Sequence, residues 1–319
     1  MEVRTADYHT AGEPFRIVTG GVDALRGDTI LQKRRDAQDR LDHVRRLLVH
    51  EPRGHADMYG CHVVEPEEGA DLGVVFFHNA GYSTACGHGT IALVTWALDS
   101  GLVERREGEN RVVVDVPSGR LDTWAWVEDD RVVSVRFRNV PAFVWARGVE
   151  LGDRVVDIAF GGAFYASVEE TVEAGELPRL IELGRELKRE VEAWQEVVHP
   201  LEPELRDVYG VIFWQDEGDD PLTQRNVTVF ADGEVDRSPC GSGTSARLAL
   251  LDDGRLPRGA ELRHRSIVGS EFTGRVVADA DVDGRPAVIT EVEGTAYRTG
   301  RAAFVLDPDD PLGEGFLLR

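Results

Sequence analysis

The sequence predicts an α+β protein of two similar β-rich lobes, each wrapped around one buried helix that begins at a cysteine. Most of the chain reads as short apolar strands separated by Gly, Asp or Pro turns. Residues 85–102 (ACGHGTIALVTWALDSGL) and 239–256 (PCGSGTSARLALLDDGRL) are helical segments that both begin with Cys-Gly-x-Gly-Thr. Their cysteines, Cys86 and Cys240, are 154 positions apart (240 − 86) in 319 residues, which indicates an internal duplication.

The composition fits an acidic protein of two domains. A chain of 319 residues is long for one hydrophobic core and suits two domains of about 150 residues each. Acidic residues number 58 against 36 lysines and arginines, and the net charge of −22 repels polyphosphates and anionic membranes. We therefore expect a small-molecule substrate as partner, no nucleic acid and no membrane, with a homodimer as one possible assembly.

The N-terminal residues and the cysteine content predict a cytoplasmic protein. The first ten residues, MEVRTADYHT, lack a basic stretch followed by an apolar one, and no run reaches the ~18 apolar residues of a membrane span. Three cysteines are an odd number and too few for a disulfide framework in so long a chain. The thiols should therefore be reduced.

The first lobe is expected to span 1–140, with 297–319 as a segment that could rejoin it, and the second lobe 141–296. Strands are predicted at 15–18, 74–77, 112–116, 121–127, 132–137, 211–214 and 227–230. One amphipathic helix, capped at Asp28, should bury Ile30, Ala37, Leu41, Val44 and Leu48. A second should bury Leu180, Leu183, Leu187, Val191, Trp194 and Val198.

The two cysteine-bearing helices should be buried, because they are apolar nearly all round. Each ends near a glycine suited to a left-handed helix stop, Gly101 in the first and Gly254 in the second. At the other end, the first N–H groups of a helix have no partner within it and carry partial positive charge. A thiol placed there can have its pKa lowered from ~8.5 to about 3.5–7.5, which makes the thiolate accessible near neutral pH.

The helix starts can also bind an anion, since small glycines let backbone amides approach a carboxylate closely. If the two helix N-termini face one another across a cleft between the lobes, they would clamp one carboxylate while the two sulfurs flank the adjacent carbon. One thiolate could then remove the Cα proton while the opposing thiol returns another, which inverts the centre. This scheme requires no metal and no cofactor.

Three other functions have to be weighed. A zinc site could draw on His55, His62, His78, His88, Cys61 and Cys86, but their spacings match no tight ligand pattern. A thiol hydrolase could use Cys86 with His9, His55 or His78 as base. His88 should not be the base in that reaction, because positions two apart on a helix face different directions. A hydrolase mechanism would also leave Cys240 without a role. A structural or binding protein would be unaffected by alkylation of its thiols.

The third cysteine is expected to be structural. Cys61 lies in YGCHVV, with no glycine-rich helix start after it. A buried cysteine of this kind usually acts as a small apolar residue.

Over nearly its whole length the sequence resembles the proline racemase family. The resemblance is carried by CGHGT (86–90), DRSPCGSGT (236–244), HTAGEP (9–14), PRGHADMYG (52–60), HNAGYSTACGHG (78–89), GGAFYA (161–166), RNVTVF (225–230), SIVGSEFTG (266–274) and the DPDDPLGEGF tail. It implies the fold shared with diaminopimelate epimerase, in which two similar β-barrel lobes each surround a central α-helix. The segments PRGHADMYG and GGAFYA resemble those of proline racemase and its relatives, so diaminopimelate itself is not the expected substrate.

The resemblance also assigns roles to individual positions. Cys86 and Cys240 match the family's two acid/base thiols. The positions that match those holding the substrate carboxylate are Gly87, His88, Gly89, Gly241 and Ser242. His88 and Asp236 match the pair that contacts the ring nitrogen; the simpler alternatives are a helix-start hydrogen bond for His88 and a helix cap for Asp236.

Within the family the two thiol positions sort the activities. Proline racemases have Cys and Cys, 4-hydroxyproline 2-epimerases Cys or Ser and then Cys, and trans-3-hydroxy-L-proline dehydratases Cys and then Thr. Cys240 therefore implies inversion of a proline-type imino acid, by a 4-hydroxyproline 2-epimerase or proline racemase. However, GYSTACGHG (81–89) is similar to the GYSTMCGH of the dehydratase branch. Dehydration of trans-3-hydroxy-L-proline is therefore the alternative.

Overall fold

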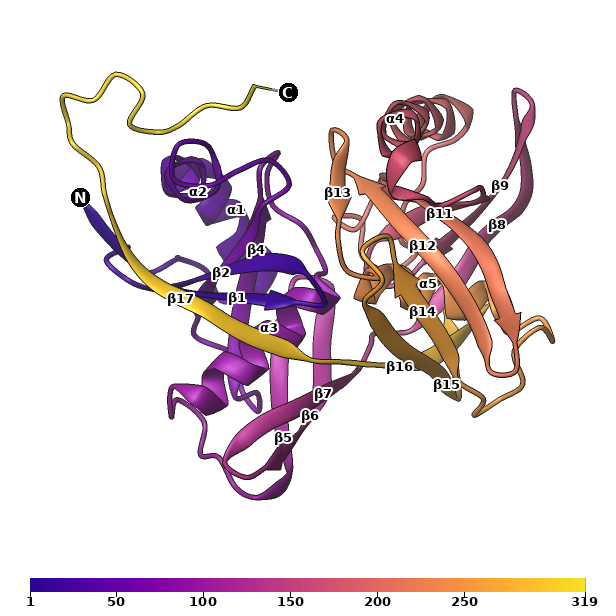
Figure 1. Ribbon diagram of the computed structural model, residues 1–319, viewed down its shortest axis with the longest axis horizontal. Helices are drawn as coiled ribbons and strands as arrows, with labels where there is room; N and C mark the ends of the chain where they lie inside the picture. The colour runs from indigo at the N-terminus through magenta and orange to yellow at the C-terminus, as the bar shows by residue number, and fades with distance from the viewer. Residues whose placement is uncertain (319) are drawn as a thin grey trace. The chain divides into compact units, whose positions relative to one another are not determined.

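A computed structural model describes residues 1–318 and divides the chain into two compact units. Unit 1 is Met1–Val135 together with the C-terminal segment from Thr295 onward, and unit 2 is Arg136–Gly294. Figure 1 shows the C-terminal strand, in yellow, lying along the N-terminal strand in indigo. The C-terminal segment therefore completes the unit that the N-terminus begins.

The strands of unit 1 form a continuous ladder. They are β1 (Glu2–Thr10), β2 (Glu13–Gly20), β3 (Tyr59–Val64), β4 (Leu72–His78), β5 (Gly108–Val116), β6 (Gly119–Glu128) and β17 (Ala296–Val305). The next strand, β7 (Arg131–Arg138), begins in unit 1 and ends in unit 2. β17 pairs antiparallel with β1 and β1 with β2, β2 runs parallel to β3, β3 antiparallel to β4, β4 parallel to β5, and β5 antiparallel to β6. This ladder packs around helix α3 (Gly87–Asp99).

Helix α3 is buried along almost its whole circumference, as its apolar sequence predicts. Of its residues only Trp96 and Asp99 are not buried. The helix closes at Ser100 and is followed by Gly101 with a φ of +74°, the left-handed stop predicted there. Its first residue, Gly87, directly follows Cys86, so the cysteine stands at the helix start.

The amphipathic helix predicted over residues 30–48 is two helices, α1 (Ile30–Arg40) and α2 (Asp42–Val49). Leu41 breaks the helical path with φ −119° and ψ 14°, and its N–H closes α1 on the Ala37 carbonyl. The cap is Thr29 instead of Asp28, because Thr29 forms a reciprocal capping box with Gln32. The predicted apolar face is nevertheless confirmed, as Ile30, Ala37, Leu41, Val44 and Leu48 are all buried.

The strands of unit 2 close into a barrel. They are β8 (Ala142–Leu151), β9 (Arg154–Phe160), β10 (Phe164–Glu169), β11 (Val208–Asp219), β12 (Leu222–Phe230), β13 (Glu234–Asp236), β14 (Leu262–Ser266), β15 (Glu271–Val282) and β16 (Arg285–Gly294). Pairing runs β8–β9–β10–β11–β12–β14–β15–β16 and returns to β8, with β13 paired to β12. All seven strands expected from the sequence lie within observed strands.

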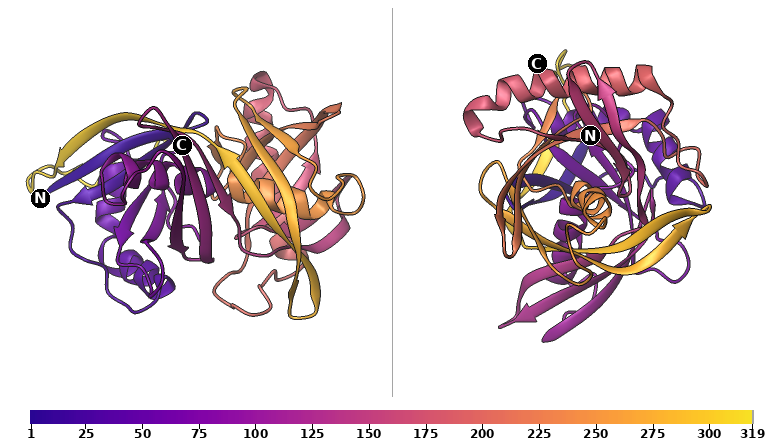
Figure 2. Two further views of the ribbon diagram at one scale, coloured as in Figure 1. Left: turned by 90° about the horizontal axis from the view of Figure 1, so that it is seen from below. Right: turned by 90° about the vertical axis from the view of Figure 1, so that its right-hand side faces the viewer.

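Helix α5 (Gly241–Leu251) lies inside this barrel, and every one of its residues is buried. The right-hand view of Figure 2 looks along this orange helix. It packs against β8, β9, β10, β15 and β16. The predicted glycine stop is only partly right: the helix closes at Asp252, and Gly254, with φ +112°, lies beyond the cap.

Helix α4 (Leu177–Trp194) packs on β11 and β12, preceded by a short 3-10 turn, η1 (Ala174–Glu176). Gly184 lets it approach closely, because a Cβ there would stand 2.8 Å from the Val229 side chain. The predicted apolar stripe extends too far. Leu183 is only partly buried and Trp194 is 42% exposed. Val198 follows the end of the helix at Gln195, where the backbone becomes extended.

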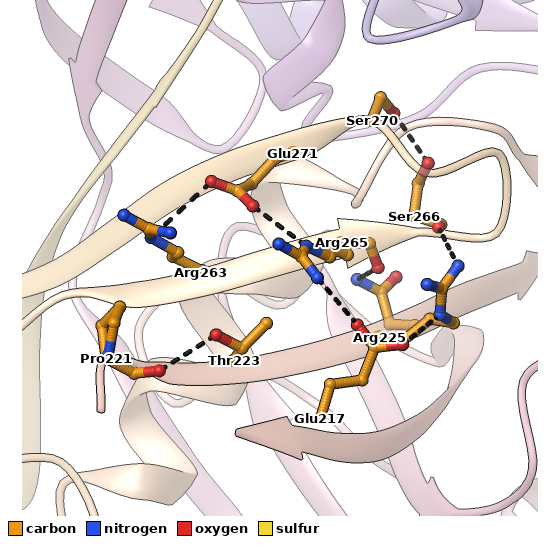
Figure 3. A network of polar contacts seen from close by, with 10 residues as sticks. Glu217, Pro221, Thr223, Arg225, Arg263, Arg265, Ser266, Ser270 and Glu271 are labelled. Carbon is orange, nitrogen blue, oxygen red and sulfur yellow. Dashed lines mark hydrogen bonds and ion pairs between the residues drawn. The ribbon is translucent and has the colours of Figure 1, made fainter. Parts of the chain in front are cut away.

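A network of charged side chains fastens the parallel pairing of β12 with β14, as Figure 3 shows. Arg225 bonds Glu217 at 2.5 Å, and Arg265 bonds Glu217 and Glu271 at 3.4 and 3.1 Å. The Ser266 and Ser270 hydroxyls, 2.7 Å apart, close the turn into β15. Arg225 belongs to 225–230, and Ser266, Ser270 and Glu271 belong to 266–274, so both family-like segments take part in holding the barrel.

No helix in residues 1–318 combines the length and the apolar character needed to cross a lipid bilayer.

Candidate active site

Cys86 is held at the start of α3 with its thiol against an imidazole. Its extended backbone, φ −155° and ψ 95°, makes it the N-cap residue, and it is 5% exposed. The Sγ atom lies 3.3 Å from Nε2 and 3.7 Å from Nδ1 of His88. An imidazole in this position can accept a proton from the thiol or donate one to the thiolate.

The prediction that His88 faces away from Cys86 is wrong. It assumed that both residues lie within the helix, where positions two apart point in different directions. Cys86 is instead the extended residue before the helix, so its side chain turns back over the first turn. His88 itself is fixed by the rings of Phe15 and Tyr59, which meet it edge-on at 5.8 and 5.0 Å.

Cys240 occupies the matching position on α5, with a different backbone. Its φ of +63° lies in the left-handed region, which costs a residue with a side chain about 1–3 kcal/mol. The turn before it holds this conformation: the Ser238 amide donates to Asp236 Oδ1 at 2.8 Å, and the Cys240 amide donates to Ser238 Oγ at 3.1 Å. Strain of this kind, stored in a surrounding network, is typical of functional positions.

The Cys240 thiol is not activated in the way that its helix start predicts. Burial, and to a lesser extent the nearby Asp236 carboxylate, raise its pKa to about 12. The Gly243 amide and the hydroxyls of Tyr165 and Thr228 lower the pKa, but by less than burial raises it. Cys240 is therefore a neutral thiol near neutral pH, which is the form that donates a proton.

The two helix starts repeat the same local contacts. Thr90 donates to the Cys86 carbonyl from both its amide and its hydroxyl at 2.9 Å, and Thr244 does the same to Cys240 at 2.7 and 2.8 Å. The third residue of each helix is a glycine, Gly89 in α3 and Gly243 in α5, and its lack of a side chain leaves room for the cysteine sulfur. A Cβ on Gly89 would stand 2.7 Å from Cys86 Sγ and would overlap the Phe15 ring, and one on Gly243 would stand 2.9 Å from Cys240 Sγ.

We expect Gly89→Ala to lower the free energy of unfolding by about 1–3 kcal/mol, because the added methyl must push aside a buried ring and a buried sulfur. The higher helix propensity of alanine, at most about 1 kcal/mol, offsets only part of this. Urea unfolding measures the change. Gly300→Ala is the control in the same unit, since a Cβ there meets nothing within 4 Å. Equal stability of the two variants would contradict the packing argument.

Comparison with known proteins identifies the family. The family model described as "Proline racemase" matches residues 5–317. The chain belongs to the proline racemase family. A trans-3-hydroxy-L-proline dehydratase of Bacillus thuringiensis subsp. konkukian is 44% identical over 98% of this chain and 97% of its own, and a 3-hydroxyproline 2-epimerase of Burkholderia multivorans is 46% identical over 99% and 98%.

Among solved structures, a hydroxyproline epimerase from Agrobacterium vitis with bound trans-4-hydroxy-L-proline superposes with a TM-score of 0.93. It is 33% identical and covers 99% of this chain and 96% of its own. The family resemblance and the fold expected from it, the diaminopimelate epimerase-like α+β class, are thereby confirmed. The protein is an enzyme of the proline racemase family.

Every site position expected from the family lies in one of two clusters. Unit 1 brings together Cys86, Gly87, His88 and Gly89, and unit 2 brings together Asp236, Cys240, Gly241 and Ser242. All of these residues are buried. Asp236 does not cap α5, because the N-cap is Cys240; its carboxylate holds the turn that precedes the helix.

Two residues of the unit 2 cluster, Ser238 and Tyr165, were not predicted from the sequence. The Tyr165 hydroxyl lies 2.7 Å from Ser242 Oγ and 3.7 Å from Cys240 Sγ. The sequence signal for Tyr165 is its place in the family-like segment GGAFYA (161–166). A tyrosine in an apolar strand of this kind is normally predicted to be a core residue. Cys61, by contrast, is fully buried as predicted, and burial raises its pKa well above the ordinary value.

Three of the histidines considered for other chemistry contact other groups, whereas His78 and His88 both lie against the Tyr59 ring, at 5.2 and 5.0 Å. His9 stacks on Tyr297, His62 packs against Phe77, and His55 bonds the neighbouring Ala56 carbonyl. In residues 1–318 no three side chains of His, Cys, Asp or Glu gather in a way that could hold a metal ion. The imidazole placed on the Cys86 thiol is that of His88.

Proposed function

We propose that this enzyme dehydrates trans-3-hydroxy-L-proline, with Cys86 as the base and His88 as the acid. The observation that carries the proposal is the 3.3 Å contact between Cys86 Sγ and His88 Nε2, which gives one cluster both proton-transfer groups. The relatives at 44–46% identity named for 3-hydroxyproline chemistry support this substrate over proline or 4-hydroxyproline, since the hydroxyproline epimerase structure is only 33% identical.

The stereochemistry of the substrate favours a one-sided pair of groups. In trans-3-hydroxy-L-proline the hydroxyl is opposite the carboxylate, so it lies on the same ring face as the Cα hydrogen. The group that removes this hydrogen therefore faces the leaving hydroxyl as well. A thiolate with an imidazole at hydrogen-bond distance can take the proton and protonate the hydroxyl from that single face.

The steps balance without a co-reactant. The Cys86 thiolate takes the Cα proton, and the electron pair of that C–H bond forms the C2–C3 double bond as the C3–O bond breaks. His88 in its protonated form donates to the departing oxygen, which leaves as water. The thiol then returns its proton to the imidazole, and the enamine product tautomerises to a cyclic imine. Amides at the helix start would stabilise the charge that develops on the carboxylate.

Inversion at Cα is the second candidate, and Cys240 is the observation that favours it. Dehydration from one face leaves a second thiol without a task. Cys240 is held as a neutral thiol, so it can protonate Cα from the face opposite Cys86 if both thiols act on one substrate. The product would be cis-3-hydroxy-D-proline. Asp236, with His88, is proposed to bind the ring nitrogen, and Gly87, Gly89, Gly241 and Ser242 the carboxylate.

Incubation in deuterated water with trans-3-hydroxy-L-proline, trans-4-hydroxy-L-proline and L-proline separately decides between these reactions. Chiral separation and mass analysis follow each product. We expect the 3-hydroxy compound to give the cyclic imine, with cis-3-hydroxy-D-proline carrying deuterium at Cα as a second product. Inversion of proline or 4-hydroxyproline, with no imine from the 3-hydroxy compound, would overturn the proposal.

A further inference from the structure

Tyr165 is a buried phenol placed between two residues of the unit 2 cluster. It stands on β10, is 1% exposed, and reaches from the barrel wall to the start of α5. Its hydroxyl is 2.7 Å from Ser242 Oγ and 3.7 Å from Cys240 Sγ, while Ser242 Oγ lies 4.0 Å from the same sulfur. The three polar atoms form a closed triangle inside an otherwise apolar cluster.

We infer that Tyr165 is a positioning residue that aims the Cys240 sulfur and supports it both as thiol and as thiolate through one rotating hydroxyl. The inference rests on the proposed function in assigning Cys240 to proton transfer. With the thiol present, S–H donates to Tyr165 Oη, and the Tyr165 O–H donates to Ser242 Oγ. With the thiolate present, the Tyr165 O–H turns to sulfur and the Ser242 O–H donates to Tyr165. Protons change direction while the heavy atoms stay in place.

The surroundings of Cys240 explain why such a residue is needed. Its backbone is strained, its sulfur is buried, and the Asp236 carboxylate nearby opposes a second negative charge. A hydrogen bond to a charged group contributes about 1.5–3 kcal/mol, and it counts most where water is absent. Without Tyr165 the thiolate would be harder to form, and the thiol would lose one of the partners that fix its direction.

The two thiols consequently have partners of different chemistry. Cys86 has an imidazole beside its sulfur, whereas Cys240 has the hydroxyls of Tyr165 and Ser242. Tyr165 therefore should affect reactions of Cys240 and leave those of Cys86 unchanged. Packing alone predicts no such difference: the Tyr165 ring meets the Tyr209 ring edge-on at 5.9 Å, and phenylalanine would keep that contact.

The test is Tyr165→Phe in the full-length protein, read by the rate at which iodoacetamide alkylates Cys240. Mass analysis of the Cys240 peptide follows the reaction from pH 7.5 to 9.5 without substrate. Since only the thiolate reacts, we expect the rate constant to fall about 10-fold at every pH, the equivalent of about 1.4 kcal/mol. Alkylation of Cys86 should not change. The turnover number for inversion should fall by a similar factor with KM nearly constant, and dehydration should persist.

Tyr82→Phe is the matched control, because Tyr82 is another buried tyrosine whose hydroxyl donates to a backbone carbonyl, that of Ala37 at 3.1 Å. It should leave Cys240 alkylation unchanged. If Tyr165→Phe unfolds, Ser242→Ala provides the second measurement, with a smaller fall in the same alkylation rate. A folded Tyr165→Phe with the parent rate would overturn the inference. Because alkylation needs no substrate, that result is distinct from a failure of the proposed reaction.

Discussion

Cys86→Ser should lower the turnover of trans-3-hydroxy-L-proline by about 10²- to 10⁴-fold, the usual contribution of a positioned general base. A serine hydroxyl is far more basic than a thiolate when ionised and far less ionised near neutral pH. The imidazole of His88, 3.3 Å from sulfur in the parent, would remain but could not form a reactive anion from it. Dehydration and inversion should fall together, since both start with removal of the same Cα proton.

Initial rates of imine release and chiral analysis of the residual substrate measure this loss. Cys61→Ala is the control for removing a thiol, because Cys61 is also fully buried in unit 1 and lies on β3. It should change stability without changing the barrier of the reaction. A Cys86→Ser enzyme that keeps either reaction at the parent rate would remove the base from the proposed mechanism.

The fold was predictable because its signals are local. Two Cys-Gly-x-Gly-Thr starts 154 residues apart identified the two buried helices, and the alternation of apolar runs with turn residues located the strands. The break at Leu41 was not predictable, because the apolar spacing continues through it. Leu41 is buried both in the single helix that was predicted and in the two helices that are observed. The exposed Trp194 has the same cause: periodicity gives a face but does not fix where a helix stops.

The site was predictable only for the residues that lie within the two Cys-Gly-x-Gly-Thr motifs and the segments next to them in the sequence. The sequence places Cys86 and Cys240 at helix starts, but it does not reveal which cap is extended and which is left-handed. That backbone difference turns Cys86 onto His88, so a rule for residues within helices gave the wrong answer. The state of the Cys240 thiol depends on burial and on groups that are distant in the sequence. Tyr165, 75 residues away from Cys240, belongs to that class.

Cys240→Ser should abolish inversion and spare dehydration, which separates the two reactions in one variant. Inversion loses its donor, so we expect a fall of about 10²- to 10⁴-fold in the appearance of cis-3-hydroxy-D-proline. Imine release should stay within about threefold of the parent rate, a change of less than about 1 kcal/mol in the barrier. Serine is close in size to cysteine and, unlike threonine, is not β-branched, so it adds no branching to the strained backbone at φ +63°.

Deuterated water makes the outcome of this substitution sharper. With Cys86 intact and no opposing donor, a substrate that loses its Cα proton but keeps its hydroxyl can regain one only from the original face. Residual trans-3-hydroxy-L-proline should therefore acquire deuterium at Cα with its configuration retained. If the Cys240→Ser enzyme releases no imine while Cys86 still exchanges the Cα proton, Cys240 takes part in dehydration and the one-sided pair of Cys86 and His88 is insufficient for that reaction.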